Sequence, residues 1–174
     1  MPAESALVVL VPEAEGLVRS FRDRHDPAAA AGVPAHITIL YPFKEPRELT
    51  PEVLRDLADL FAHVPGFDVS LRECRHFPGV LYLAPEPAEP VCHLTEIVAA
   101  HYPENPPYGG RFAEIIPHLT VAHEEDELRM AEITAQLHHA ALDYFPIHAP
   151  VRTVTLMESR DGHWRISRRF PLAE

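Results

Sequence analysis

The sequence has few cysteines and no long apolar run. Of its 174 residues only two are cysteine, Cys74 and Cys92, and they do not form a CxxC pair. Neither a disulfide scaffold nor a cysteine-rich zinc site is therefore expected. No apolar stretch approaches the roughly 20 residues that span a bilayer, and the N-terminal residues lack the basic and apolar regions of a signal peptide. These absences predict a cytoplasmic protein with reduced thiols that does not bind a membrane.

Basic residues are also scarce. Fifteen Lys and Arg residues stand against 26 Asp and Glu, which gives a formal net charge of −11. Such a surface repels the phosphates of a long polynucleotide, because non-specific binding of nucleic acid depends on basic contacts. A single nucleotide or an RNA terminus, held by local donors, remains compatible with this charge. The composition therefore favours a monomer with a small-molecule or chain-end site over a protein with a long nucleic-acid groove.

Hydrophobic residues make up 47% of the chain, which is enough for a buried core. Their periodicity predicts strands at residues 5–12, 36–43, 67–77, 80–84, 115–122, 147–158 and 163–171. It predicts helices at residues 13–24, 50–64, 90–101 and 124–141, with loops at 26–34 and 102–111. Two of the turns contain glycine, at Pro78-Gly79 and Asp161-Gly162.

The order of these elements repeats. One strand is followed by two αβαββ units, at about residues 13–85 and 89–171, offset by about 80 positions. This order predicts an α+β fold and a single bilobal domain over residues 1–174. Its two pseudo-symmetric lobes would be antiparallel sheets with outer helices, and a central cleft between the lobes is the natural site.

Two short motifs occupy the same place in each unit, His36-Ile37-Thr38 and His118-Leu119-Thr120. Side chains at positions i and i+2 of a strand share a face and lie about 6.6–7 Å apart along it. Each strand can thus present an imidazole and a hydroxyl together, while the residue between them points into the core. Facing lobes would bring two histidines and two threonines into one small volume.

A His-x-Thr triplet by itself is a weak signal. With 12 histidines and 7 threonines, about half a copy is expected by chance, and the chain contains a third copy, His93-Leu94-Thr95. That copy lies in a predicted helix, where positions i and i+2 diverge by roughly 200°. We therefore expect no site there. The other two copies are informative because their strand context and placement match.

Paired histidines suit the cleavage of a phosphodiester. One neutral imidazole can take a proton from the attacking oxygen, and a protonated one can give a proton to the leaving oxygen. Their ordinary pKa near 6.5 lets both forms coexist near neutral pH. The threonine hydroxyls can donate to the non-bridging phosphoryl oxygens. This scheme requires no metal and no cofactor.

Through these motifs the sequence resembles the 2H phosphoesterases, a superfamily that includes 2′-5′ RNA ligase-like proteins and cyclic phosphodiesterases. The segments HITILYPF (36–43) and PHLTVAH (117–123) carry the resemblance, and the bilobal order agrees over nearly the whole chain. The resemblance implies two α+β lobes with both motifs lining a central cleft. It also implies metal-independent attack on 2′,3′-cyclic or 2′-5′ phosphodiesters of nucleotides or RNA ends. His36 and His118 match the catalytic pair, and Thr38 and Thr120 match the residues that bind the phosphate.

One position departs from that pattern. Some RNA ligase-like members have an arginine shortly after the second motif, where this chain has His123. On a regular strand His123 faces away from His118, so we expect no catalytic role for it. The missing arginine, together with the acidic charge, weakens the case for tRNA-sized substrates.

Several other residues are secondary candidates. Tyr41 and Phe43 have the parity of core residues and are expected to pack, with base stacking as the alternative. Tyr108 and Trp164 are candidates for the border of the cleft or for packing between the lobes. Arg165 or Arg168 is a candidate phosphate contact, although solvated surface positions are the simpler interpretation.

Two other functions compete with a metal-independent phosphoesterase. A non-catalytic module that binds a nucleotide or a phosphate is the first, but mere binding does not require two proton-transfer groups. A metal-dependent hydrolase is the second, and the absence of HExxH or a similar ligand spacing argues against it.

Overall fold

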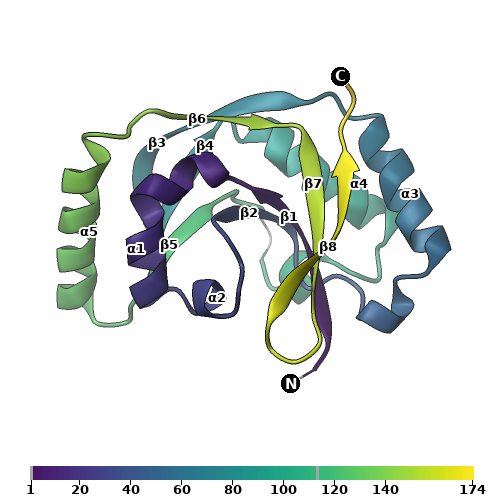
Figure 1. Ribbon diagram of the computed structural model, residues 1–174, viewed down its shortest axis with the longest axis horizontal. Helices are drawn as coiled ribbons and strands as arrows, with labels where there is room; N and C mark the ends of the chain where they lie inside the picture. The colour runs from purple at the N-terminus through teal and green to yellow at the C-terminus, as the bar shows by residue number, and fades with distance from the viewer. Residues whose placement is uncertain (1, 113) are drawn as a thin grey trace.

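The computed structural model describes residues 2–112 and 114–174, and it contains two four-stranded antiparallel sheets with helices outside them (Figure 1). The first sheet has the order β2-β1-β7-β8, from β1 (Glu4–Leu10), β2 (His36–Leu40), β7 (Thr153–Ser159) and β8 (Trp164–Pro171). The second has the order β5-β4-β3-β6, from β3 (Phe67–Phe77), β4 (Val80–Glu86), β5 (Leu119–His123) and β6 (Ile147–Val151). The predicted α+β class with two lobes is confirmed.

Several of the helices begin after a residue whose side chain caps the first turn. The helices are α1 (Glu15–His25), α2 (Pro27–Ala30), α3 (Pro51–Ala62), α4 (Glu89–His101) and α5 (Glu127–Ala141), with short 3₁₀ turns at Pro12–Ala14, Pro46–Glu48 and Pro107–Gly110. The Thr50 hydroxyl accepts a hydrogen bond from the Val53 amide at the start of α3, and Pro51 occupies the first helical position. The Asp126 carboxylate accepts from the Leu128 and Arg129 amides at the start of α5.

Two helices, α1 and α4, connect two strands of one sheet but pack against the other sheet. Helix α1 joins β1 to β2 but packs against β5 and α5, whereas α4 joins β4 to β5 but packs against β2 and α3. Figure 1 shows α1 beside α5 at one side of the molecule and α4 beside α3 at the other. This exchange holds the edge strands β2 and β5, which carry the two motifs, next to one another.

Each sheet also draws strands from both repeat units. The first sheet combines β1 and β2 with β7 and β8 from the end of the chain, and the second combines β3 and β4 with β5 and β6. The units at 13–85 and 89–171 therefore do not each build one sheet. The symmetry that survives in space relates β1-α1-β2 to β4-α4-β5.

The single strand predicted at residues 147–158 is wrong. The chain leaves the second sheet after Val151 and enters the first at Thr153, so β6 pairs with β3 while β7 pairs with β1 and β8. The alternation of buried residues breaks at the same place, because Ile147, Ala149 and Val151 are buried with period two and the next fully buried residue is Val154. A single regular strand cannot bury odd-numbered residues up to Val151 and then even-numbered residues from Val154 on the same face.

Two element boundaries also differ from the prediction. The predicted loop at 26–34 contains the short helix α2, which is capped by the Asp26 carboxylate on the Ala28 amide at 3.0 Å. Strand β5 begins at Leu119 instead of residue 115, since Pro117 has no amide hydrogen to donate to a sheet. Within the described residues, none of the helices is both long and apolar enough to cross a bilayer.

The third His-x-Thr copy lies on α4, as expected, and its histidine is exposed whereas its threonine is buried. The Thr95 hydroxyl donates to the Ile39 carbonyl of β2 at 2.6 Å. We expect Thr95→Val to lower the free energy of unfolding by about 1–3 kcal/mol, because it leaves this carbonyl without its buried donor. His93→Ala, at an exposed position of the same turn, should change it by less than about 0.5 kcal/mol. Urea denaturation of both variants measures the difference, and equal effects would contradict the role assigned to this bond.

Candidate active site

The two motif strands present their side chains in the same way. In each motif the histidine and threonine are partly exposed, whereas Ile37 and Leu119 between them are fully buried. Strands β2 and β5 lie in contact, and the charge of His118 acts on His36. The structure thus brings the four predicted residues to the facing edges of the two sheets.

Both imidazoles are held by the same local hydrogen bond. Nδ1 of His36 lies 2.8 Å from the Pro34 carbonyl, and Nδ1 of His118 lies 2.8 Å from the Ile116 carbonyl, in each case two residues earlier. A carbonyl oxygen only accepts, so Nδ1 must carry the hydrogen in both rings. In the neutral state Nε2 therefore keeps its lone pair, and it is the atom free to exchange a proton with a ligand.

Burial favours the neutral form of both histidines. It lowers the pKa of His36 from 6.5 to about 4, against a smaller opposing effect of the Pro34 carbonyl. Burial also lowers the pKa of His118, and the nearby His123 contributes in the same direction. Both shifts reflect the cost of placing a charge in a poorly hydrated site. An anion bound between the rings would favour the protonated forms and reverse them.

Tyr108 lies across the two motifs. Its ring is stacked on that of His118, with centroids 6.5 Å apart and planes at 25°, and its phenol adjoins the Thr38 side chain. Its backbone is in the left-handed region, with φ of 52°, and its amide donates to the Tyr41 carbonyl at 2.7 Å. Such a conformation is unfavourable for a bulky residue and tends to be retained at functional positions. Tyr108 was one of the two candidates for the border of the cleft.

A cavity of about 230 Å³ opens beside the first motif. It lies over the face of the first sheet and is lined by His36 and Thr38 together with Glu4, Ala6, Val8, Ala28, Val33, Tyr41, Met157 and Trp164. Trp164, the other border candidate, is therefore part of its wall. Glu4, Ala6, Val8 and Met157 were not among the residues predicted from the sequence, although the period-two spacing of residues 4, 6 and 8 on β1 already places them on one face.

The same place in the second lobe is filled by aromatic rings. Tyr82 is the β4 partner of Thr120, whereas Val8 is the β1 partner of Thr38. The Tyr82 ring is buried and stacks on Phe77 with centroids 4.3 Å apart, and both rings contact His118 edge-on. The two lobes are thus similar in backbone but different in the volume next to their threonines.

Helix α1 anchors the chain that leads into His36. Arg22 donates to the Val33 carbonyl at 2.9 Å, and Glu15 accepts from the Ala35 amide at 2.7 Å. Arg22 also forms a buried ion pair with Asp26 at 3.0 Å, in which each side chain is at most 3% exposed. These contacts fix residues 33–35, which include the carbonyl that orients His36.

The secondary candidates lie in three kinds of place: the core, the cavity wall and the exposed surface. Phe43 is buried in the core against Tyr102, as predicted. Tyr41 is half-buried and packs against the cluster of Ala6, Val8, Val33 and Met157, in keeping with the packing predicted for it. It also lines the cavity, and its hydroxyl donates to Glu4 at 2.8 Å. His123 lies at the exposed end of β5, with Nε2 3.9 Å from an Asp26 oxygen. Arg165 and Arg168 are exposed on β8, and among the described residues Arg165 approaches Asp161 at 3.8 Å.

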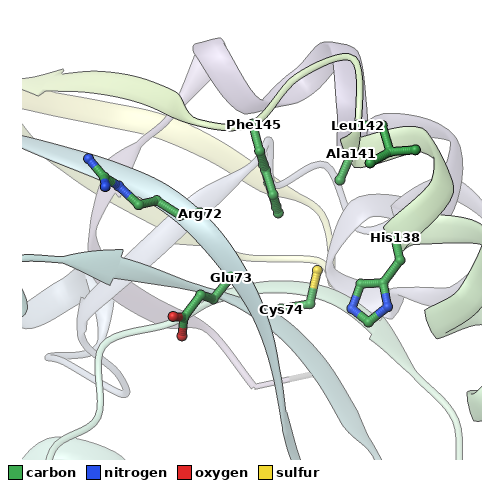
Figure 2. Close-up of a pocket in the computed structure, with 7 residues that line it drawn as sticks. All are labelled: Arg72, Glu73, Cys74, His138, Ala141, Leu142 and Phe145. Atoms are coloured by element: carbon green, nitrogen blue, oxygen red, sulfur yellow. The ribbon is translucent and has the colours of Figure 1, made fainter.

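A second hollow, of about 530 Å³, lies between β3 and α5, away from both motifs (Figure 2). Cys74 and His138 are in its wall, together with Leu142 and Phe145. Burial raises the pKa of the Cys74 thiol to about 11, so it is protonated and unreactive near neutral pH. In the part of the chain that the structure describes, no three His, Cys, Asp or Glu side chains gather in a way that would hold a metal ion.

The fold and the paired motifs together define a bilobal protein with two histidine motifs on facing sheet edges. The sequence model of the 2′-5′ RNA ligase superfamily matches residues 10–163, nearly the whole chain. The protein belongs to this superfamily, that of the 2H phosphoesterases. A protein of Geobacillus kaustophilus named "Putative phosphoesterase" is 24% identical over 140 residues, and one of Geobacillus thermodenitrificans with the same name is 25% identical over 140 residues. In both cases the match covers 75% of each chain.

Solved structures share the fold at low identity. E. coli LigT in complex with 3′-AMP has a TM-score of 0.64 and 18% identity, with full coverage of both chains. Protein TT0787 of Thermus thermophilus has a TM-score of 0.63 and 19% identity over 97% of each chain. The bilobal arrangement of this chain is therefore that of LigT.

The buried ion pair on α1 gives a prediction about stability. We expect Arg22→Met to lower the free energy of unfolding by about 3–5 kcal/mol, because Asp26 would stay buried without its cation. Arg19→Met on the same helix is the matched control, since Arg19 pairs with Glu15 at the same spacing but is 70% exposed. Its effect should be about 0–1 kcal/mol. Similar losses for both variants in chemical denaturation would contradict the importance of the buried pair.

Proposed function

We propose that this protein hydrolyses 2′,3′-cyclic or 2′-5′ phosphodiesters of nucleotides or RNA ends, with His36 and His118 as the acid–base pair. The observation that supports this most directly is the matched pair of Nδ1–carbonyl bonds, which leaves Nε2 of both rings available for proton transfer. Thr38 and Thr120, one strand position beyond the intervening core residue, would donate to the non-bridging oxygens of the phosphate.

The reaction balances with these groups and water. One neutral imidazole takes a proton from a water molecule while the oxygen of that water bonds to phosphorus. The opposite, protonated imidazole gives a proton to the ribose oxygen as its bond to phosphorus breaks. A 2′,3′-cyclic ester yields a phosphomonoester and a free hydroxyl. At the end, the histidine that acted as base is protonated and the histidine that acted as acid is neutral. The scheme needs no metal ion.

The relatives support the chemical class of the ligand. LigT structures are described as complexes with 3′-AMP and with phosphate, and a nucleoside monophosphate carries both the ester and the base that a cleft of this kind would hold. Binding without turnover, by a nucleotide-sensing module on the same scaffold, is the alternative that the first experiment addresses.

The first prediction concerns the two histidines. Purified protein in excess EDTA should open nucleoside 2′,3′-cyclic phosphates, followed by ³¹P NMR. His36→Ala and His118→Ala should each lower the rate by about 10²–10⁴, because each removes one proton-transfer group. His63→Ala is the matched control, since this exposed histidine also binds a backbone carbonyl through Nδ1 but lies at the end of α3.

The outcomes separate enzyme from binding module. Full activity in a variant lacking both histidines would refute the mechanism. Activity lost in chelator and restored by a divalent metal would favour a metal-dependent hydrolase. Calorimetric binding of a nucleotide without turnover would favour the binding module.

The second prediction concerns pH. Catalysis requires one protonated and one neutral histidine, and in the free protein the pKa of His36 is about 4 while that of His118 lies below 6.5. We expect kcat/KM to be highest between about pH 4 and the lowered pKa of His118, and to fall at higher pH as the acid loses its proton. Bound phosphodiester anion raises both pKa values, so kcat should persist to higher pH than kcat/KM. A kcat/KM that keeps rising above pH 7 would contradict this assignment.

A further inference from the structure

The cavity beside the first motif has a polar group at its far end. Glu4 lies four residues before Val8 on β1, and Val8 is the partner of Thr38. Four residues of strand span about 13 Å. A nucleotide whose phosphate lies at Thr38 and His36 would therefore extend its base toward Glu4.

The walls between these two ends suit a flat aromatic ring. Ala6 and Val8 form a low floor on β1, Met157 continues it on β7, and Tyr41 and Trp164 stand beside it with ring centroids 6.1 Å apart and planes at 62°. The volume, about 230 Å³, is below the 300–1,000 Å³ typical of sites for drug-sized ligands. It therefore fits one ring system, and aromatic walls stabilise a stacked base.

The carboxylate at the end of the cavity is oriented and accepts hydrogen bonds only. The Tyr41 hydroxyl donates to Glu4 Oε1 at 2.8 Å, and among the described residues Oε2 has no hydrogen-bond partner. An ionised carboxylate offers acceptors on both oxygens and no donor. It matches a base edge that carries two neighbouring N–H donors and repels an edge with an acceptor at either place.

The geometry points to a guanine-binding subsite in this cavity, with Glu4 accepting from N1–H and the exocyclic N2–H of the base. Adenine and cytosine each place a ring-nitrogen acceptor beside their amino group, and uracil flanks its N–H with two carbonyl oxygens. Guanine alone of the four bases presents two adjacent donors. This inference rests on the proposed phosphoesterase function and adds the base of the substrate to it.

Substrate competition tests the subsite. The wild-type kcat/KM for guanosine 2′,3′-cyclic phosphate should exceed that for the adenosine, cytidine and uridine esters by about 10- to 100-fold, the effect expected of hydrogen bonds to a charged group. Glu4→Gln keeps the shape but places an amide donor against the guanine edge, so it should abolish this preference and favour the adenosine ester. Glu13→Gln, at an exposed glutamate on the following 3₁₀ turn, is the matched control and should keep the guanine preference.

Binding of the four nucleoside 3′-monophosphates, measured by calorimetry, makes the test independent of turnover. Tighter binding of 3′-GMP that is lost in Glu4→Gln and kept in Glu13→Gln would support the subsite, whether or not any ester is hydrolysed. A lack of hydrolysis of all four cyclic esters would refute the proposed phosphoesterase function but not the subsite. Equal hydrolysis of all four cyclic esters would overturn the guanine subsite and leave the phosphoesterase proposal standing. Equal binding of all four monophosphates would overturn the subsite as well.

Discussion

The site depends on the contact between two sheet edges, β2 and β5, that are far apart in the sequence. An exposed edge strand tends to pair with other chains. Here the two edges lie side by side, and each is covered by the helix that connects the strands of the other sheet. Helix α1 packs on β5 while Arg22 and Glu15 hold the residues before His36, and α4 packs on β2 through Thr95. The position of one motif relative to the other is therefore determined by helix packing across the lobes.

The pseudo-symmetry of the backbone does not extend to the side chains next to the motifs. Val8 beside Thr38 leaves an open cavity, whereas Tyr82 beside Thr120, stacked on Phe77, fills the equivalent space. A ligand with a phosphate at one end and a ring at the other thus has room in one direction. The loss of side-chain symmetry therefore favours one orientation of a bound ligand, which two equivalent histidines alone could not do.

Much of the fold and the core of the site could be predicted from the sequence. Alternation of apolar residues indicated both motif strands, and the helical context of His93 and Thr95 set the third copy apart. The cavity could not be predicted, because it depends on the order of strands in the sheet. Met157 and Trp164 border it only since β7 crosses from one sheet to the other and pairs with β1. Tyr41 packs as its parity predicts, but its place in the cavity wall depends on residues of other strands and could not be predicted from parity along one strand.

In the proposed mechanism, the charge of the site connects binding with catalysis. The chain has a net charge of −11, and Arg22, the cation that acts on His36, is offset by the buried carboxylate of Asp26. An anionic phosphodiester bound as proposed would therefore draw its favourable interactions from the proton of the histidine pair and from the threonine hydroxyls. Because burial disfavours that proton in the free protein, the anion and the proton stabilise each other on binding. In the proposed mechanism, the proton that helps to hold the substrate would then be the one available to the leaving oxygen. Because the described residues that line the cavity include no Lys or Arg, the same two rings would serve both to bind the ligand and to cleave it.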